Sequence, residues 1–156
     1  MAATGKYLMN ALERPIIAVL NAYAAAVLAK DVDAFMVLYD DEACIFDMWG
    51  EWSYDGADAW RAVVTDWFGS LGDDRVVVTF KEVQTIVTPE LAVAYAFVTY
   101  QAESPAGIFL RALTNRMTLS LRPQQGAWKI VHEHTSAPAD FNTSKVILQR
   151  KAAQGA

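Results

Sequence analysis

The last predicted strand of the chain reads Trp128-Lys129-Ile130-Val131-His132-Glu133-His134-Thr135-Ser136-Ala137-Pro138. It holds both histidines of the sequence, His132 and His134, two residues apart. Because alternate side chains of a strand point to the same face, the pattern predicts that Ile130 and both histidines share one face, with the imidazoles roughly 6.5 to 7 Å apart. Two titratable groups beside a tryptophan and a serine indicate a pocket wall, although histidines that only satisfy hydrogen bonds give the same pattern.

Three other β-rich runs come before this strand, at about residues 75–88, 91–103 and 108–122. Turn residues separate them, which favours mostly antiparallel pairing. Further upstream, apolar spacing predicts a helix over about 15–29, a short helix capped by Asp31, a strand over 43–48 and a third helix whose stripe contains Trp60 and Trp67. Residues after Asp140 are expected to form a short polar helix or a frayed end. Helices first and strands afterwards indicate the α+β class.

Composition narrows the classes of function. The chain has 156 residues and a formal charge of −5, and its 13 Lys and Arg residues are scattered, which argues against nucleic-acid binding. No apolar run approaches the roughly 20 residues that cross a bilayer, and the N-terminus does not resemble a signal peptide, so a cytoplasmic protein without a membrane partner is expected. Cys44 is the only cysteine, which excludes an internal disulfide.

Several motifs together resemble the SnoaL-like branch of the nuclear transport factor 2-like superfamily. They are 30–33 before the second helix, 38–43 leading into the first strand, the loop to Gly56, and 116–118 leading to Gly126 and Trp128. The resemblance covers about residues 12–138 as a single domain and leaves 1–11 and 139–156 as terminal extensions. The closing strand also resembles the end of the association domain of calmodulin-dependent kinase II, a relative that assembles subunits.

The resemblance implies an α+β fold in which a cone-shaped, curled antiparallel sheet wraps around a long N-terminal helix, a cystatin-like α+β barrel with an open cavity. Members of the superfamily include ketosteroid isomerases, polyketide cyclases, dehydratases, epoxide hydrolases and non-catalytic scaffolds. The fold therefore does not decide the function.

Asp47 and Tyr23 match the positions of the general-base aspartate and the oxyanion tyrosine of ketosteroid isomerases. Apolar neighbours flank Asp47 in the stretch 45–49, so partial desolvation should raise its pKa and make it a usable base. The alternative is that Asp47 caps a loop through backbone amides and that Tyr23 is a core residue.

Ketosteroid isomerases also use a protonated carboxylic acid on the third strand, and the run 115–121 of this chain contains no acid. Arg116 is the informative residue in that run, because a guanidinium can hold a carboxylate or enolate in a bidentate grip. A structural salt bridge to Asp47 or Glu133 is the competing explanation.

The histidines admit three readings: hydrogen bonding within the sheet, ligand contact or proton transfer, and a zinc site that would need a third ligand such as Asp47. We expect no metal, a catalytic role for His134 and substrate contact for His132. The loop aromatics Trp49, Trp52 and Tyr54 follow neither helical nor strand spacing, so they are predicted to form a cavity lid or a dimer contact.

These residues predict a cofactor-independent acid–base enzyme of cyclase, isomerase or dehydratase type, acting on a small apolar carbonyl or carboxylate compound. Asp47 would take the proton, while Tyr23, Arg116 and His134 would stabilise the resulting negative charge. The alternative is a non-catalytic ligand-binding or homo-oligomerisation domain. In both cases a homodimer or larger homo-oligomer is expected.

Overall fold

The structure, a computed structural model, describes residues 11–151. Its elements follow the order α1 (Arg14–Ala29), α2 (Val32–Met36), β1 (Tyr39–Phe46), β2 (Tyr54–Asp55), α3 (Ala57–Ser70), β3 (Arg75–Val87), β4 (Ala92–Glu103), β5 (Phe109–Gln124) and β6 (Ala127–Ser136). The predicted α+β class and the four long C-terminal strands are confirmed. The predicted absence of a signal peptide concerns residues 1–10, which lie outside the described part.

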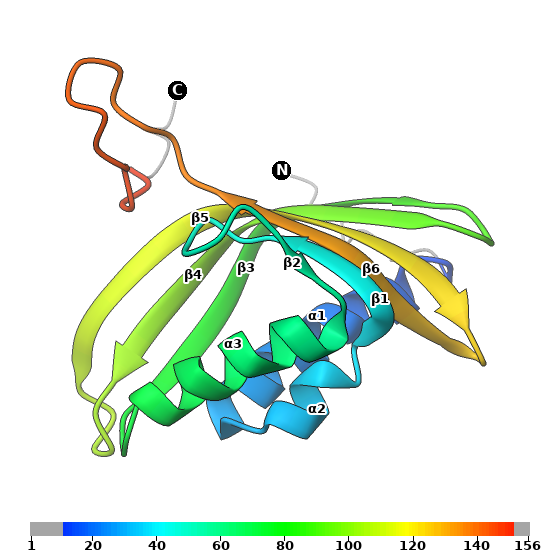
Figure 1. Cartoon of the computed structure of the whole chain (residues 1–156), viewed down its shortest axis with the longest axis horizontal. Coiled ribbons are helices and arrows are strands. Elements are labelled where there is room, and N and C mark those ends of the chain that lie inside the picture. The colour runs from blue at the N-terminus through cyan, green and yellow to red at the C-terminus, as the bar shows by residue number, and fades with distance from the viewer. Residues whose placement is uncertain (1–10, 152–156) are drawn as a thin grey trace, which may run out of the picture.

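The six strands form one curled, unclosed sheet in the order β2-β1-β6-β5-β4-β3. Every neighbouring pair is antiparallel except β1 and β6, which run parallel. The sheet arches over the three helices, which all lie on its concave side (Figure 1). Between residues 11 and 151 no helix is both long enough and apolar enough to span a bilayer.

Several segments differ from the sequence prediction, among them the short strand β2, which was not predicted. The first strand begins at Tyr39 instead of 43, so the acidic run 40–42 lies inside β1, where a register shift between Tyr39 and Cys44 interrupts its pairing with β6. Residues 139–151 form no helix; they make an arm with an isolated bridge between Ala139 and Val146. The arm returns to the sheet, where the Thr114 amide donates to the Leu148 carbonyl at 2.8 Å.

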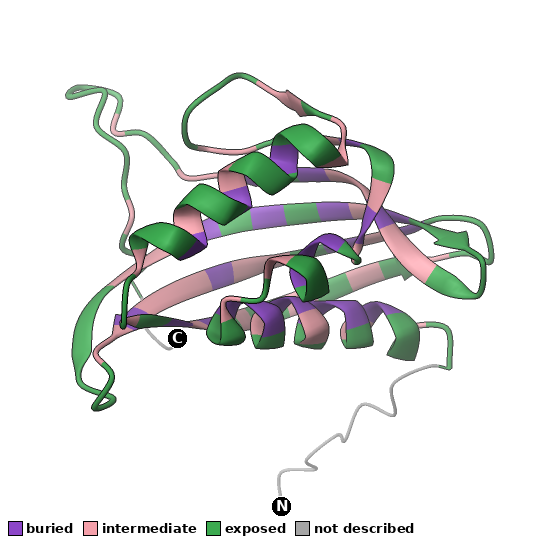
Figure 2. Cartoon of the chain, turned by 60° about the horizontal axis from the view of Figure 1, so that its bottom comes forward, coloured by how far each residue is buried: buried purple, intermediate pink, exposed green. Residues whose placement is uncertain are grey.

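The core lies between the helices and the concave face of the sheet, and the buried sides of the helices turn toward the strands (Figure 2). Phe35 is at the centre of an aromatic cluster, with ring centroids 4.7 Å from Tyr23, 5.4 Å from Tyr39 and 5.7 Å from Phe68. Phe35 is fully buried. This packing brings α1, α2, β1 and α3 together. It also places Tyr23 against the sheet, where its ring contacts Phe80 of β3.

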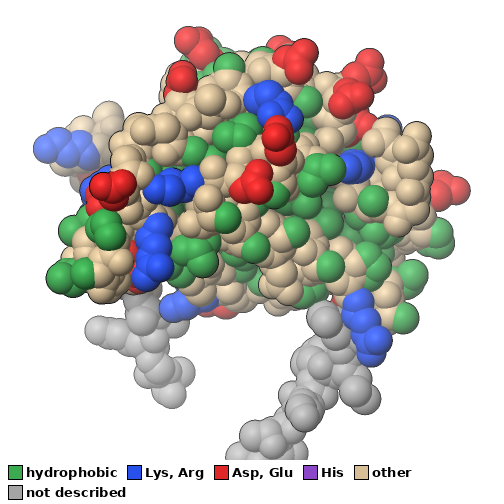
Figure 3. Space-filling view, turned by 90° about the horizontal axis from the view of Figure 1, so that it is seen from below, with side chains coloured by type: hydrophobic (Ala, Val, Ile, Leu, Met, Phe, Trp, Pro, Cys, Tyr) green, Lys and Arg blue, Asp and Glu red, His purple; other side chains and the backbone are tan. Residues whose placement is uncertain are grey.

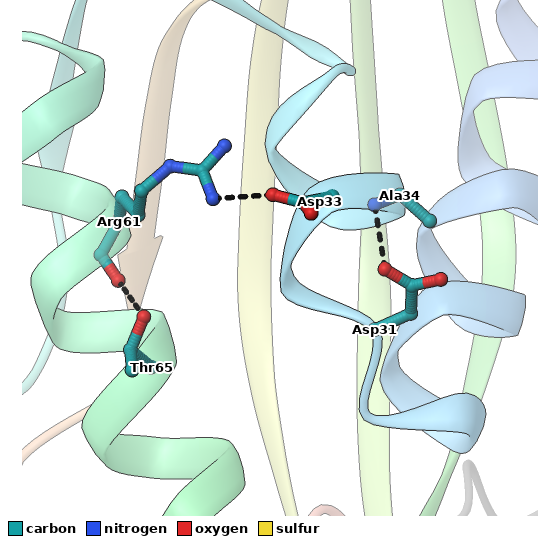
Figure 4. A network of polar contacts seen from close by, with 5 residues as sticks. All are labelled: Asp31, Asp33, Ala34, Arg61 and Thr65. Carbon is teal, nitrogen blue, oxygen red and sulfur yellow. Dashed lines mark hydrogen bonds and ion pairs between the residues drawn. The ribbon is translucent and has the colours of Figure 1, made fainter.

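Polar contacts cap the short helix α2 and connect it to α3 at the surface. The Asp31 carboxylate accepts the Ala34 amide at 2.9 Å, as the predicted N-cap requires. Asp33, in the first turn of α2, pairs with Arg61 of α3 at 2.6 Å, and Thr65 donates to the Arg61 carbonyl at 2.7 Å (Figure 4). Because both partners of the ion pair are exposed it adds little stability, and α3 is positioned mainly by its buried side, which carries Trp60, Val64 and Phe68.

A bulge in β6 decides which of its side chains face inward. Opposite β5, His132 pairs with Ser120 while Ile130 pairs with the next residue, Leu121, so Val131 has no partner of its own. The extra residue resets the alternation. Ile130 is buried in the core before the bulge, and Glu133 and Thr135 are the buried residues after it. The prediction that Ile130 and both histidines share one face is therefore wrong.

Candidate functional site

A cavity of about 530 Å³ lies between the concave face of the sheet and helices α1 and α3. This volume is within the usual range for small-molecule sites. Its walls are mainly apolar and aromatic, formed by Trp49, Trp60, Val63, Trp67, Leu71, Val76, Ala102, Ala112, Leu113 and Leu148. Polar groups from six segments also line it: Tyr23, Asp47, Tyr100, Arg111, Asn115, Glu133, Thr135 and Gln149.

Asp47 directly follows β1 and faces the cavity. Thr135 of β6 donates its hydroxyl to the Asp47 carboxylate at 2.7 Å and accepts the Met48 amide at 2.9 Å, which fixes the carboxylate in place. Burial raises the pKa of Asp47, and hydrogen bonds from Thr135 and from the Met48 and Trp49 amides oppose that rise. Both interpretations of Asp47 from the sequence therefore apply: its carboxylate is partly desolvated, and it also caps the loop that follows β1.

Tyr23 and Tyr100 form the second polar feature of the cavity. Tyr23 comes from α1 and Tyr100 from β4, and their hydroxyl oxygens are 2.8 Å apart. Burial raises the pKa of both phenols well above the ordinary value, and the negative charge of Glu133 acts in the same direction. Both hydroxyls are therefore protonated at neutral pH, and one of them retains a hydrogen to donate to a ligand.

Glu133 is the buried acid of the site, with 1% of its surface exposed. Tyr39 donates to its Oε1 at 2.8 Å. Burial and the charge of Asp47 raise the pKa of Glu133 to about 8, although the Tyr39 hydrogen bond opposes the rise. Below that pH Glu133 is a neutral acid that faces the cavity and can donate a proton or a hydrogen bond.

Sequence reasoning treated Glu133 only as a partner for Arg116 and sought a cavity acid on the run 115–121. That run belongs to β5, whereas Glu133 lies on the adjacent strand β6. The sequence signal that could have identified Glu133 as a cavity acid was its place in a strand that also carries Ile130 and Trp128. Strict alternation assigned it to the outer face, and only the bulge at Val131 turns it inward.

Asn115 adds a polar group whose hydrogen bonding is incomplete. It is 5% exposed, and its Nδ2 donates to the Met48 sulfur at 3.3 Å. Its Oδ1 has no hydrogen-bond partner within the described residues. A buried polar atom without a partner is costly, so a ligand donor at this point would be stabilising.

Arg116, His132 and His134 lie away from the cavity, on the convex face of the sheet. Arg116 and His134 are exposed, and none of the three lines the cavity. Arg116 donates from Nε to the Ser136 hydroxyl at 3.1 Å. No histidine is visible on the helical side of the molecule (Figure 3). The structure does not bring these three residues together with Asp47 and Tyr23.

The two imidazoles pack edge-on against Phe46, at centroid distances of 4.9 Å for His132 and 5.7 Å for His134. His132 Nδ1 also lies 2.7 Å from the Cys44 carbonyl oxygen. Asp47, the third ligand that a zinc site would have needed, faces the opposite side of the sheet. In the part of the chain that the structure describes, no three His, Cys, Asp or Glu residues are grouped so as to hold a metal ion.

The three loop aromatics have different positions. Trp49 lines the cavity, whereas Trp52 is 97% exposed and does not. Tyr54 supports the loop: its hydroxyl accepts the Glu51 amide at 3.1 Å and donates to the Trp49 carbonyl at 3.4 Å. Gly50 has a φ of +78°, and a Cβ there would lie 2.3 Å from the Tyr54 hydroxyl, so the close approach requires glycine.

Comparison with known proteins gives a family and several solved structures. A family described as "SnoaL-like domain" matches residues 16–140. An NTF2-like protein of unknown function from Pseudomonas putida KT2440 is 24% identical, with a TM-score of 0.79 over 90% of this chain and 96% of the other. A protein of unknown function from Mycobacterium tuberculosis is 15% identical, with a TM-score of 0.69 over 86% and 80%.

A candidate calcium/calmodulin dependent protein kinase II association domain from Xanthomonas campestris is 16% identical, with a TM-score of 0.65 over 80% of this chain and 86% of the other. No curated protein matches the sequence. At these identities the structures share the fold alone, so the function must be argued from the cavity.

Proposed function

The chain belongs to the SnoaL-like domain family, and from this premise we propose that its cavity binds a small apolar carbonyl compound and catalyses proton transfer on it without a cofactor. The reaction would be of the cyclase, isomerase or dehydratase type. Asp47 takes the proton, and the neutral donors opposite it stabilise the oxyanion that develops on the substrate.

One observation carries this proposal: the same cavity holds a carboxylate and a set of acids that burial keeps protonated. The pKa of Asp47 is raised, but hydrogen bonds from Thr135 and the loop amides favour its charged form. Tyr23, Tyr100 and Glu133 all have pKa values raised by burial. Pairs of groups whose surroundings drive their protonation states apart are the usual arrangement for acid–base chemistry.

The roles predicted for Arg116 and His134 pass to other residues in this proposal. Tyr100 and Glu133 face the cavity, where charge would develop, while Arg116 and His134 face outward. Trp60 and Trp67 add aromatic surface to the cavity wall, and electrostatic interactions are stronger beside such apolar groups than in water.

A general probe tests the proposal without knowledge of the natural substrate. In 5-nitrobenzisoxazole, a base removes the ring C–H proton, the N–O bond breaks and a coloured nitrophenolate forms. We expect the wild-type protein to accelerate this ring opening well above the rate given by free acetate at equal concentration. Tyr100→Phe should lower kcat/KM about tenfold, less than the 10²–10³ of a lost oxyanion-hole donor, because the nitro group already stabilises the phenolate.

Tyr95→Phe is the matched control, because Tyr95 lies on the same strand but is exposed on the other face. It should leave the rate unchanged. Binding of the probe without any turnover above the acetate rate would contradict the enzymatic proposal and favour a ligand-binding protein.

The convex face of the sheet supports a homodimer as a second part of the proposal. Strand register aligns Phe46, His134, Thr118 and Tyr95 in one row across β1, β6, β5 and β4. Phe46 and Tyr95 are 41% and 46% exposed. An open sheet face that carries exposed aromatic side chains is typical of a contact between subunits.

Light scattering coupled to size exclusion should therefore give twice the 17.2 kDa of one chain. Tyr95→Arg should shift the mass to that of a monomer, because two guanidinium groups would meet near the two-fold axis or be buried without partners. Asp66→Arg, on the exposed side of α3, is the control and should remain a dimer. A monomeric wild type would remove this part of the proposal.

A further inference from the structure

Arg111 stands at one end of the cavity. It lies on β5 and shares the concave face with Leu113 and Asn115, since all three line the cavity. Arg111 lies four positions before Asn115, which corresponds to about 13 Å along a strand. Tyr100 pairs with Leu113, and Asn115 pairs with Val98, so the polar groups of the proposed reaction lie toward the Asn115 end.

Arg111 is the only Lys or Arg among the described residues that line the cavity. The adjacent cation Arg75 is already paired with Glu103 at 3.5 Å. Arg111 itself makes no ion pair or side-chain hydrogen bond with any residue between 11 and 151. Its guanidinium is therefore available to an anion that enters the cavity, and it can hold a carboxylate through two parallel hydrogen bonds.

The C-terminal arm completes this end of the cavity. Leu148 and Gln149 both line it. The Gln149 amide donates to the carbonyl of Ala112, the residue next to Arg111, at 2.7 Å, and the Leu148 carbonyl accepts the Thr114 amide. Arg150 then anchors the arm by pairing with Glu82 at 2.8 Å and by lying 3.5 Å over the Phe97 ring. The arm thus places an apolar and a polar side chain beside the Arg111 end.

The two ends of the cavity favour opposite ligand groups. The two acids Asp47 and Glu133 both lie at one end, and the ionised form of either repels a ligand anion from that end. A neutral hydroxyl or carbonyl is suited to the tyrosines and to the free oxygen of Asn115. At the other end Arg111 attracts an anion. The cavity wall also carries the aromatic side chains of Trp49, Trp60 and Trp67, which suit a flat apolar body.

We propose that the ligand of this cavity is a fused aromatic or polycyclic acid, with a hydroxyl or carbonyl at the Tyr100 end and a carboxylate held by Arg111. Arg111 is then the residue that selects for the acid, and the different polarity of the two ends fixes which way round the bound ligand lies. The inference rests on the proposed function only for which end of the ligand reacts. The preference of Arg111 for a carboxylate can be measured by binding alone.

Calorimetric titration with two matched probes tests the selection. 6-Hydroxy-2-naphthoic acid carries the anion, and its methyl ester has the same rings and hydroxyl without the charge. At low ionic strength the wild-type protein should bind the acid roughly fivefold to tenfold more tightly than the ester. Arg111→Met should abolish this preference, and Arg111→Lys should retain part of it.

Arg122→Met is the control, because Arg122 lies on the same strand, is exposed and does not line the cavity. It should keep the full preference for the acid. Equal affinity for acid and ester in the wild type, a preference that survives in Arg111→Met, or no binding of the acid would each overturn the inference. The proposed function is tested independently of this inference. Its probe, 5-nitrobenzisoxazole, carries no carboxylate, so turnover of that probe by the wild type does not depend on anion selection.

Discussion

Asp47→Asn is expected to lower kcat/KM for the ring opening of 5-nitrobenzisoxazole by about 10²- to 10⁴-fold, the usual contribution of a positioned general base. The amide can still accept the Thr135 hydroxyl, so the loop that follows β1 keeps its anchor. Glu133 does not replace the lost base at neutral pH, because burial, the largest cause of its raised pKa, remains in the variant and favours its protonated form. Stopped-flow or plate absorbance of the nitrophenolate gives the rates.

The pH dependence of the wild type should identify the same two groups. kcat/KM should rise as Asp47 ionises, at a pH above the ordinary range for aspartate because burial raises its pKa. It should fall again as pH passes about 8, where Glu133 ionises and places a second negative charge beside the developing phenolate. Asp47→Asn should remove the rising limb.

Asp66→Asn on the exposed side of α3 controls for the loss of one charge and should retain wild-type rates. Thermal denaturation of Asp47→Asn shows whether the fold is kept. A well-folded variant with full turnover would exclude Asp47 as the base, and the chemistry would then have to be assigned to another group of the cavity.

Glu133→Gln should change the dependence of stability on pH more than any other single substitution considered. Folding raises the pKa of Glu133 from 4.5 to about 8, so the folded chain holds a proton that the unfolded chain releases in this window. The stabilisation is complete below pH 4.5 and is lost as pH rises through about 8. At about 1.4 kcal/mol for each pKa unit, the loss amounts to up to about 5 kcal/mol.

A glutamine cannot ionise, yet it accepts the Tyr39 hydroxyl as Glu133 does. The free energy of unfolding of Glu133→Gln should therefore vary much less between pH 5 and pH 9, and at pH 9 the variant should be more stable than the wild type by several kcal/mol. Urea titrations across this range measure the difference.

Glu90→Gln, in the exposed turn before β4, is the control and should reproduce the wild-type slope. A wild-type stability that is flat or rising between pH 5 and pH 9 would show that Glu133 ionises freely in the folded chain. It would then be an anion at neutral pH and unable to donate to an oxyanion.

Local patterns predicted most of the secondary structure. The helix over 14–29 and the long strands follow from apolar spacing and from turns rich in proline and glycine. The two-residue strand β2 was missed because Tyr54 and Asp55 carry no periodic signal. The arm after Asp140 is held by contacts with β5 and with Glu82, which are distant in sequence and cannot be read from local propensity.

The cavity was predictable only in part. Asp47, Tyr23 and Trp49 were singled out from the sequence and lie in it, whereas the two histidines and Arg116 lie on the other face. The reason is geometric. Strict alternation assigns Glu133 and His134 to faces opposite to those that the bulge at Val131 gives them. A one-residue bulge depends on the pairing of β6 with β5, so the sequence of β6 alone does not reveal it.

The parallel pairing of β1 with β6 also affects when the sheet can form during synthesis of the chain. A nascent chain exposes Tyr39–Phe46 long before the ribosome has added Ala127–Ser136, and until then β1 has only the two-residue β2 as a partner. Contacts over such separations, 94 residues for Tyr39 and Glu133, slow folding. The cavity therefore cannot form until β6 has been synthesised and has inserted between β1 and β5, and until then the facing edges of these two strands have no partner.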